Sequence, residues 1–243
     1  MIARVAVVPH PPLLVPELVG GDHPEVRVVR DATVAVAAEL AAAASRWVGL
    51  GADPAGARDL DAHQAGTFAG FGVDVVARLS ANPARTAVPD PAMPLPALVA
   101  GWLRERAGAT EVPVRLVPPD LPAAACREYG ERLARELAGP EPVGLLVLGD
   151  GSHRHGERAV GRPDPRAAAF DDAVHAALAA ADPAALAAID PALAAELGAE
   201  GRAPWQVLAG LAAGDPRGWK STDARLLVPF GVAYHLAVWE PSR

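Results

Sequence analysis

The sequence has very little lysine and cysteine. Lys220 is the only lysine among 22 basic residues, and Cys126 is the only cysteine. A single cysteine cannot form an intramolecular disulfide, which fits a reducing compartment, and we therefore expect a cytoplasmic protein. The formal net charge is −7, so the chain lacks the basic patch that a nucleic-acid binder usually carries. These features exclude a disulfide-stapled scaffold and argue against a nucleic-acid partner.

Long hydrophobic runs are absent as well. No stretch of about 18 uncharged apolar residues occurs, and we expect no membrane-spanning segment. The apolar run at residues 3–8 is too short for the hydrophobic region of a secretion signal, and no small-residue cleavage site follows it. The sequence therefore gives no reason to expect export or a membrane partner.

Hydrophobic residues, mostly Ala, Val and Leu, make up 51% of the 243 residues, which is enough for a sizeable core. Short Val- and Leu-rich segments alternate with longer Ala-rich segments of helical periodicity. We predict strands at 3–8, 46–50, 112–117 (an edge strand, because of Pro113), 143–149 and twice within 225–238, with one or two short strands in 66–77. We predict helices at 25–45, 94–107, 122–138, 165–181, 183–197 and 203–213. The alternation predicts one domain over residues 1–243, with a three-layer αβα fold, a mainly parallel but mixed sheet and a C-terminal strand pair.

Two histidine-bearing segments follow strongly hydrophobic predicted strands, where open α/β sheets bind ligands. The first is PHPPLL, residues 9–14, in which prolines flank His10 and restrict its backbone. A fixed imidazole suits a metal ligand, and the alternative is a turn histidine that bonds a backbone carbonyl. The second is GDGSHRHG, residues 149–156, where His153 is a candidate general acid or base and Asp150 or Ser152 a candidate partner. The alternative for this segment is a solvated polar loop.

Two further residues are weaker candidates. Glu200 lies in the turn before the helix 203–213, where its carboxylate either faces a cleft or is ordinary surface charge. His63 lies in a polar loop after the second strand and is by its local context a solvated histidine. We interpret His175 and His235 as structural or packed residues. No phosphate-binding glycine loop, HExxH or CxxC pattern is present, which argues against a nucleotide site and a structural zinc site.

Four stretches resemble segments of the class III extradiol ring-cleaving dioxygenase catalytic (B) subunit superfamily, which also contains the Memo-like proteins. They are PHPPLLVPELVG (9–20), MPLPALVAGWLRERAG (93–108), the strand with GDGSHR (143–154) and GAEGRAPWQVLAGLAAG (198–214). Active members of this superfamily hold Fe(II) by two histidines and one glutamate and use another histidine as acid and base. The resemblance implies an oxidoreductase that cleaves a catecholic aromatic with O2. It also implies His10 and Glu200 as iron ligands and His153 as the catalytic residue.

The sequence departs from the family at the second histidine ligand. Active members carry an Asn-Asp-His type segment after the second strand, whereas this chain reads VGLGADPAG. His63 is the nearest candidate for that ligand. If the site is complete, Pro12, Asp150, Ser152 and Trp205 are the expected substrate-binding residues. The alternatives are a catalytically degenerate relative that binds a small molecule or a partner, and a metal-dependent hydrolase with zinc. We expect a homodimer on general grounds, and the sequence leaves open a separate small subunit.

Overall fold

The structure, a computed structural model, describes residues 1–21, 23–82 and 87–242. Its main sheet contains seven strands, which are β1 (Ile2–Val8), β2 (Trp47–Ala52), β3 (Arg58–Leu60), β6 (Val114–Val117), β7 (Val143–Leu148), β8 (Trp219–Leu227) and β9 (Tyr234–Pro241). They lie in the order β3-β6-β2-β7-β1-β9-β8. The four strands β6, β2, β7 and β1 are parallel to one another. β3 and β9 are antiparallel to their neighbours, and β8 and β9 form an antiparallel pair.

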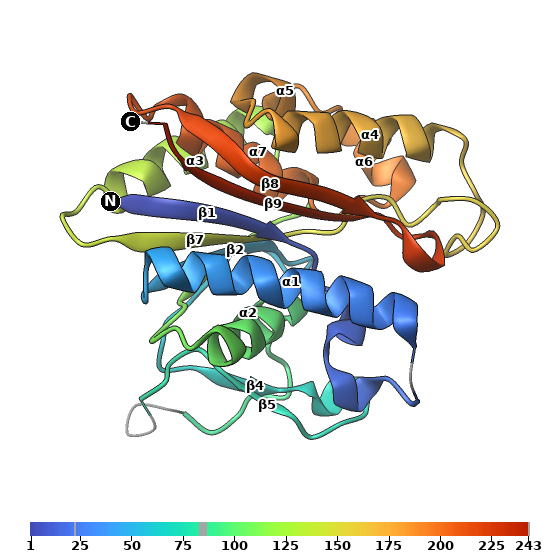
Figure 1. Cartoon of the computed structure of the whole chain (residues 1–243), viewed down its shortest axis with the longest axis horizontal. Helices are drawn as coiled ribbons and strands as arrows, with labels where there is room; N and C mark the ends of the chain where they lie inside the picture. The colour runs from blue at the N-terminus through green and yellow to red at the C-terminus, as the bar shows by residue number, and fades with distance from the viewer. Residues whose placement is uncertain (22, 83–86, 243) are drawn as a thin grey trace.

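Helices cover both faces of this sheet (Figure 1). One face packs against α1 (Pro24–Ala43) and α2 (Leu95–Ala107), and a small sheet of β4 (Ala65–Thr67) and β5 (Val76–Arg78) lies beyond α2. The other face packs against α3 (Ala123–Glu136), α4 (Arg166–Ala179) and α7 (Arg202–Ala213), with the short helices α5 (Pro183–Ala187) and α6 (Pro191–Leu197). The expected three-layer αβα fold with a mixed sheet and a C-terminal strand pair is confirmed. Among the described residues, none of the helices has the length and apolarity that a bilayer crossing requires.

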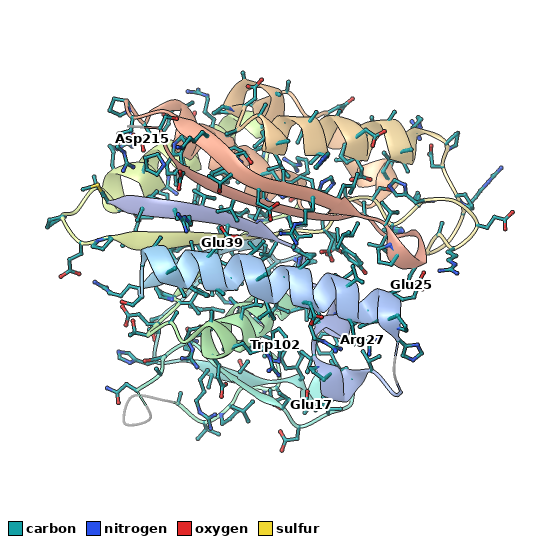
Figure 2. The ribbon with its side chains drawn as sticks, in the orientation of Figure 1. Glu17, Glu25, Arg27, Glu39, Trp102 and Asp215 are labelled. Atoms are coloured by element: carbon teal, nitrogen blue, oxygen red, sulfur yellow. The ribbon has the colours of Figure 1, made fainter. Side chains whose placement is uncertain are left out.

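Each face of the sheet has its own hydrophobic core. Successive side chains of a strand point to opposite faces, so Ala6 and Val8 of β1 join the core under α1 and α2. Val5 and Val7 of the same strand join the core under α3, α4 and α7. All four side chains are fully buried. Glu25, labelled at the right-hand end of α1 in Figure 2, is exposed, whereas Arg30 of the same helix donates to the carbonyls of Leu13 and Leu14.

The helices α3 and α7 cross at very short range because glycines lie at their contact. A Cβ atom at Gly130 would fall 2.1 Å from a backbone oxygen of α7, and one at Gly210 would fall 2.4 Å from a backbone oxygen of α3. Neither position therefore accepts a side chain without separating the helices. This contact holds the second half of α7 against α3.

Two predictions about the elements are corrected by the structure. β6 is not an edge strand, because the short antiparallel strand β3, which the sequence did not predict, lies outside it. Pro113 precedes β6, where its missing N–H costs no hydrogen bond, and its carbonyl accepts from the amide of Gly49. The predicted helix 183–197 is two helices, since Asp190 caps a new helix by accepting from the amides of Ala192 and Leu193.

Candidate functional site

The loops that follow β1 and β7 place His10 beside Asp150. These two strands are parallel neighbours, so both loops emerge at the same edge of the sheet. The backbone amide of His10 donates a 2.9 Å hydrogen bond to Oδ1 of Asp150. Nδ1 of the His10 ring lies 3.7 Å from the same oxygen, which is too long for a hydrogen bond. Nδ1 is buried and has no hydrogen-bond partner among the described residues, so a small shift or a bound molecule is needed to satisfy it.

Glu200 lies on the opposite side of the same imidazole. The amide of Gly201 donates to the carbonyl oxygen of Asp150 at 2.8 Å, which ties the turn before α7 to the loop after β7. Oε2 of Glu200 lies 3.7 Å from Nε2 of His10. The structure thus brings His10, Asp150 and Glu200 together, as the sequence predicted for these segments.

A cavity of about 450 Å³ opens beside Glu200. Its wall is formed by the loop after β6, by α6 and by the turn before α7, and it includes Pro119, Asp120, Pro191, Ala194, Gly198, Glu200 and Arg202. Most of the lining is proline and alanine, with two carboxylates and one guanidinium. The Arg202 guanidinium donates to the carbonyls of Pro119 and Leu121, which holds the loop after β6 in place. Pockets of this size and character bind small molecules.

Burial raises the pKa of the Asp150 carboxyl above its ordinary value, because the carboxylate loses contact with water. The negative charge of Glu200 raises this pKa further, whereas the ring and amide of His10 and the ring of His235 lower it. Burial also raises the pKa of Tyr234, and the charge of Asp150 adds to that effect. The site therefore holds a carboxylate that gains from any group able to donate a hydrogen bond to it.

The residues present do not fit a centre of two histidines and one carboxylate. Asp150 faces Nδ1 of the His10 ring and Glu200 faces Nε2, so one ion bound to His10 can contact only one of these carboxylates. Among the described residues, no three His, Cys, Asp or Glu side chains are placed to hold a metal ion together. Asp53 follows β2, at the position where the superfamily that the sequence resembles carries its second histidine. It accepts from the Ala55 amide and from Arg58.

His63, the candidate second iron ligand, lies at the other end of the sheet. β3 runs antiparallel to β6, so Leu60 at its end pairs with Val114 at the start of β6. The chain that leaves β3 therefore lies at the amino ends of the parallel strands, whereas His10 follows the carboxyl end of β1. His63 is exposed, and its carbonyl accepts from the amide of Ala87. This corrects the expectation that His63 joins His10 and Glu200.

In the loop after β7, the positions of His153 and Ser152 do not suit the roles expected of them. Nδ1 of His153 lies 2.9 Å from the carbonyl oxygen of Val160. Its ring packs on Gly198, where a Cβ atom would fall 1.9 Å from Nε2. His153 thus packs against Gly198 in the turn after α6 and is not among the residues that line the cavity, and no hydrogen bond or ion pair joins it to the described side chains of the site. Ser152 is fully buried and donates to the carbonyl of Leu197 at 2.9 Å, so it is not open to a substrate.

Two residues expected to line a substrate pocket also belong elsewhere. Trp205 is fully buried, because Gly201 packs directly on its indole ring and leaves no opening. The Trp205 and His235 rings are nearly perpendicular, with ring centroids 5.2 Å apart. Pro12 is half-buried at the start of a 3-10 turn (Pro12–Leu14) and does not line the cavity beside Glu200. The expectation for Trp205 is corrected, since its ring serves packing. The role expected of Pro12 stays a prediction.

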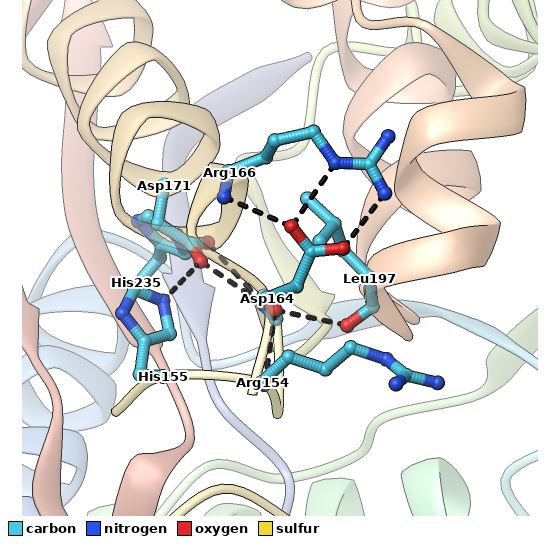
Figure 3. Close-up of polar contacts among 8 residues, drawn as sticks. Arg154, His155, Asp164, Arg166, Asp171, Leu197 and His235 are labelled. Carbon is cyan, nitrogen blue, oxygen red and sulfur yellow. Dashed lines mark hydrogen bonds and ion pairs between the residues drawn. The ribbon is translucent and has the colours of Figure 1, made fainter. Parts of the chain in front are cut away.

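A second polar cluster behind the site was missed in the sequence (Figure 3). Asp171 of α4 is fully buried, and its two oxygens lie 2.7 Å from Nε2 of His155 and 2.7 Å from Nε2 of His235. The amide of Ser152 donates to the same carboxylate at 3.2 Å. Asp171 and the exposed Asp172 are neighbours in an Ala-rich helix. The rotation of the helix turns Asp171 toward β9, and the local sequence does not tell the two residues apart.

Comparisons with known proteins give a fold relationship but no family. No family model matches the chain, and no curated protein matches it. A crystal structure of an uncharacterized protein from Escherichia coli K12 is similar, with a TM-score of 0.56 and 15% sequence identity. The match covers 98% of this chain and 99% of that one. At this identity the likeness is one of fold, over the whole length of both chains.

Proposed function

We propose that this chain is a relative of the class III extradiol dioxygenase catalytic subunits that binds a small hydroxylated aromatic compound. In this proposal His10, Asp150 and Glu200 bind the hydroxyl groups, and the site does not hold iron through two histidines and a glutamate. The observation that carries the proposal is the His10 ring enclosed by two carboxylates, one of which borders a cavity. The sequence resemblance supports the aromatic nature of the ligand.

The chemistry of the site favours hydroxyl groups over acids. A carboxylate accepts short, charge-assisted hydrogen bonds from a phenolic hydroxyl, and Nε2 of His10 offers a further polar contact beside Glu200. The proline and alanine wall of the cavity suits the apolar face of an aromatic ring. A carboxylate or phosphate on the ligand would meet Asp120 and Glu200, while the Arg202 guanidinium already donates to the Pro119 and Leu121 carbonyls and to Gln206. Negatively charged compounds are therefore disfavoured.

The proposal is tested by titrating catechol into metal-free protein in a calorimeter. We expect binding to the wild type, weaker binding to His10→Asn, and unchanged binding to His63→Asn, since His63 lies at the far end of the sheet. Benzoate serves as the acidic probe and is expected not to bind. Equal catechol binding by the wild type and His10→Asn would count against the proposed site.

The ring-cleaving dioxygenase is the second candidate, because two of the three expected iron ligands, His10 and Glu200, lie 3.7 Å apart. Metal analysis of the purified protein separates the candidates. Stoichiometric iron together with catechol-dependent oxygen uptake supports the dioxygenase, stoichiometric zinc supports a hydrolase, and metal-free protein that binds catechol supports our proposal. The homodimer and the cytoplasmic location expected from the sequence remain predictions.

A further inference from the structure

We infer that Asp171 is a positioning residue for the candidate site, because its buried carboxylate holds the loop after β7 and thereby keeps Asp150 beside His10. This inference rests on the proposed function, since it concerns the same site. It assigns a role to the cluster of Asp171, His155 and His235, which the proposed ligand does not touch.

The Asp171 carboxylate joins three parts of the fold. His155 belongs to the loop after β7, His235 to β9, and Asp171 itself to α4 (Figure 3). A carboxylate only accepts hydrogen bonds, so each imidazole donates through Nε2 across 2.7 Å. The Asp171 and His235 side chains are fully buried, and that of His155 is 13% exposed. Such a carboxylate is stable in the interior because each oxygen has a strong donor.

The same carboxylate is in direct contact with the loop backbone next to Asp150. The Ser152 amide donates to Asp171 at 3.2 Å. A Cβ atom at Gly151 would fall 2.3 Å from Oδ1 of Asp171, so a residue at this position has no room for a side chain. The Gly151 amide donates to the Ala233 carbonyl at 2.8 Å, which fixes the loop against the residue before β9.

The loop in turn carries the contacts that make the site. Asp150 accepts from the His10 amide through its side chain and from the Gly201 amide through its carbonyl. Ser152 donates to Leu197 at the end of α6, directly before the turn with Glu200. A displacement at Asp171 would therefore move Asp150 relative to both His10 and Glu200. A purely structural role for Asp171 would lower stability and leave the surroundings of His10 unchanged.

The test uses the full-length protein with Asp171→Asn, a change of charge without a change of size. The amide offers one oxygen acceptor and one NH2 donor in place of two acceptor oxygens, so one imidazole must change its tautomer or lose its hydrogen bond. We expect the variant to fold, the ring 15N resonances of His10 to move in a long-range 1H–15N spectrum, and catechol affinity to fall about tenfold, as for other residues that orient a binding group. Asp172→Asn, the exposed neighbour in the same helix, is the matched control. It is expected to change neither the His10 resonances nor the catechol affinity.

Unchanged His10 resonances and catechol affinity in a folded Asp171→Asn protein would overturn the inference. If that variant does not fold, His155→Ala removes only the imidazole nearest the surface, and the same two readouts decide, with smaller changes expected. If the wild type does not bind catechol, the proposed function fails on its own. The His10 resonances then still show whether Asp171 positions the loop.

Discussion

Replacement of Asp150 by asparagine should stabilise the protein at neutral pH. The pKa of Asp150 is raised above its ordinary value of 3.8, mainly by burial. Between 3.8 and this raised pKa, the folded state keeps a proton that the unfolded state has released. Unfolding then releases a proton, so the contribution of Asp150 to stability falls as pH rises through this window. Asparagine has the size of aspartate, can accept from the His10 amide, and carries no charge to desolvate.

The magnitude follows from the difference between the pKa of Asp150 in the folded and in the unfolded chain. A tenfold difference between the two acid dissociation constants corresponds to about 1.4 kcal/mol of stability. The side chain of Asp150 is 17% exposed, so solvent screening reduces this value little. We therefore expect Asp150→Asn to raise the free energy of unfolding at neutral pH, by about 1.4 kcal/mol for each tenfold difference between the two dissociation constants. Below the ordinary pKa of aspartate both proteins are neutral at this position, and the difference should vanish.

Urea unfolding followed by tryptophan fluorescence, from about pH 4 to about pH 8, measures this difference. The wild type and Asp150→Asn are compared at each pH, so that other titrating groups cancel. Asp172→Asn controls for the loss of one exposed carboxylate and is expected to give no pH-dependent difference. The reasoning is refuted if Asp150→Asn is less stable than the wild type at neutral pH, or if the difference is constant across the range.

Three further predictions follow from single contacts. Gly130→Ala should cost about 3 kcal/mol in urea unfolding, since its Cβ would meet a backbone oxygen of α7, whereas Gly139→Ala, with no atom within 4 Å of the added Cβ, should cost almost nothing. Trp205→Ala should lower the free energy of unfolding by about 4 kcal/mol, because the ring is fully buried. A loss of stability below about 1 kcal/mol would contradict this packing. Glu200→Gln should weaken catechol binding about tenfold by calorimetry, while Glu196→Gln at the surface end of α6 should not, and equal effects would argue against the cavity.

The regular elements were largely predictable because periodicity reports burial. The run of apolar residues at 143–149 indicates a strand buried on both faces, and β7 is the centre of the sheet. Asp182 before Pro183 predicts a helix start, and its side chain accepts from the first amides of α5. β3 was not predictable, because two of its three residues are charged and exposed, and only its pairing with β6 makes it a strand.

The candidate site was predictable only in part. The meeting of His10 and Asp150 follows from the rule that polar residues after adjacent parallel strands lie at one edge. Glu200 precedes a helix and was expected there only from the family resemblance. The failure at His63 has the same origin, since the direction of β3 decides at which edge its loop emerges. Trp205 and Ser152 carry binding-competent groups in the sequence. Trp205 is buried under Gly201 and Ser152 bonds the carbonyl of Leu197, and no local pattern reveals these contacts.

The sequence by itself determined the alternation of strands and helices, the buried centre of the sheet and the position of two polar loops at its carboxyl edge. These depend on local periodicity and on the geometry of parallel strands. Tertiary structure alone decided which polar residue is buried, as with Asp171 beside the exposed Asp172. The reason is that burial of a charge depends on partners such as His155 and His235, which lie 16 and 64 residues away in the sequence.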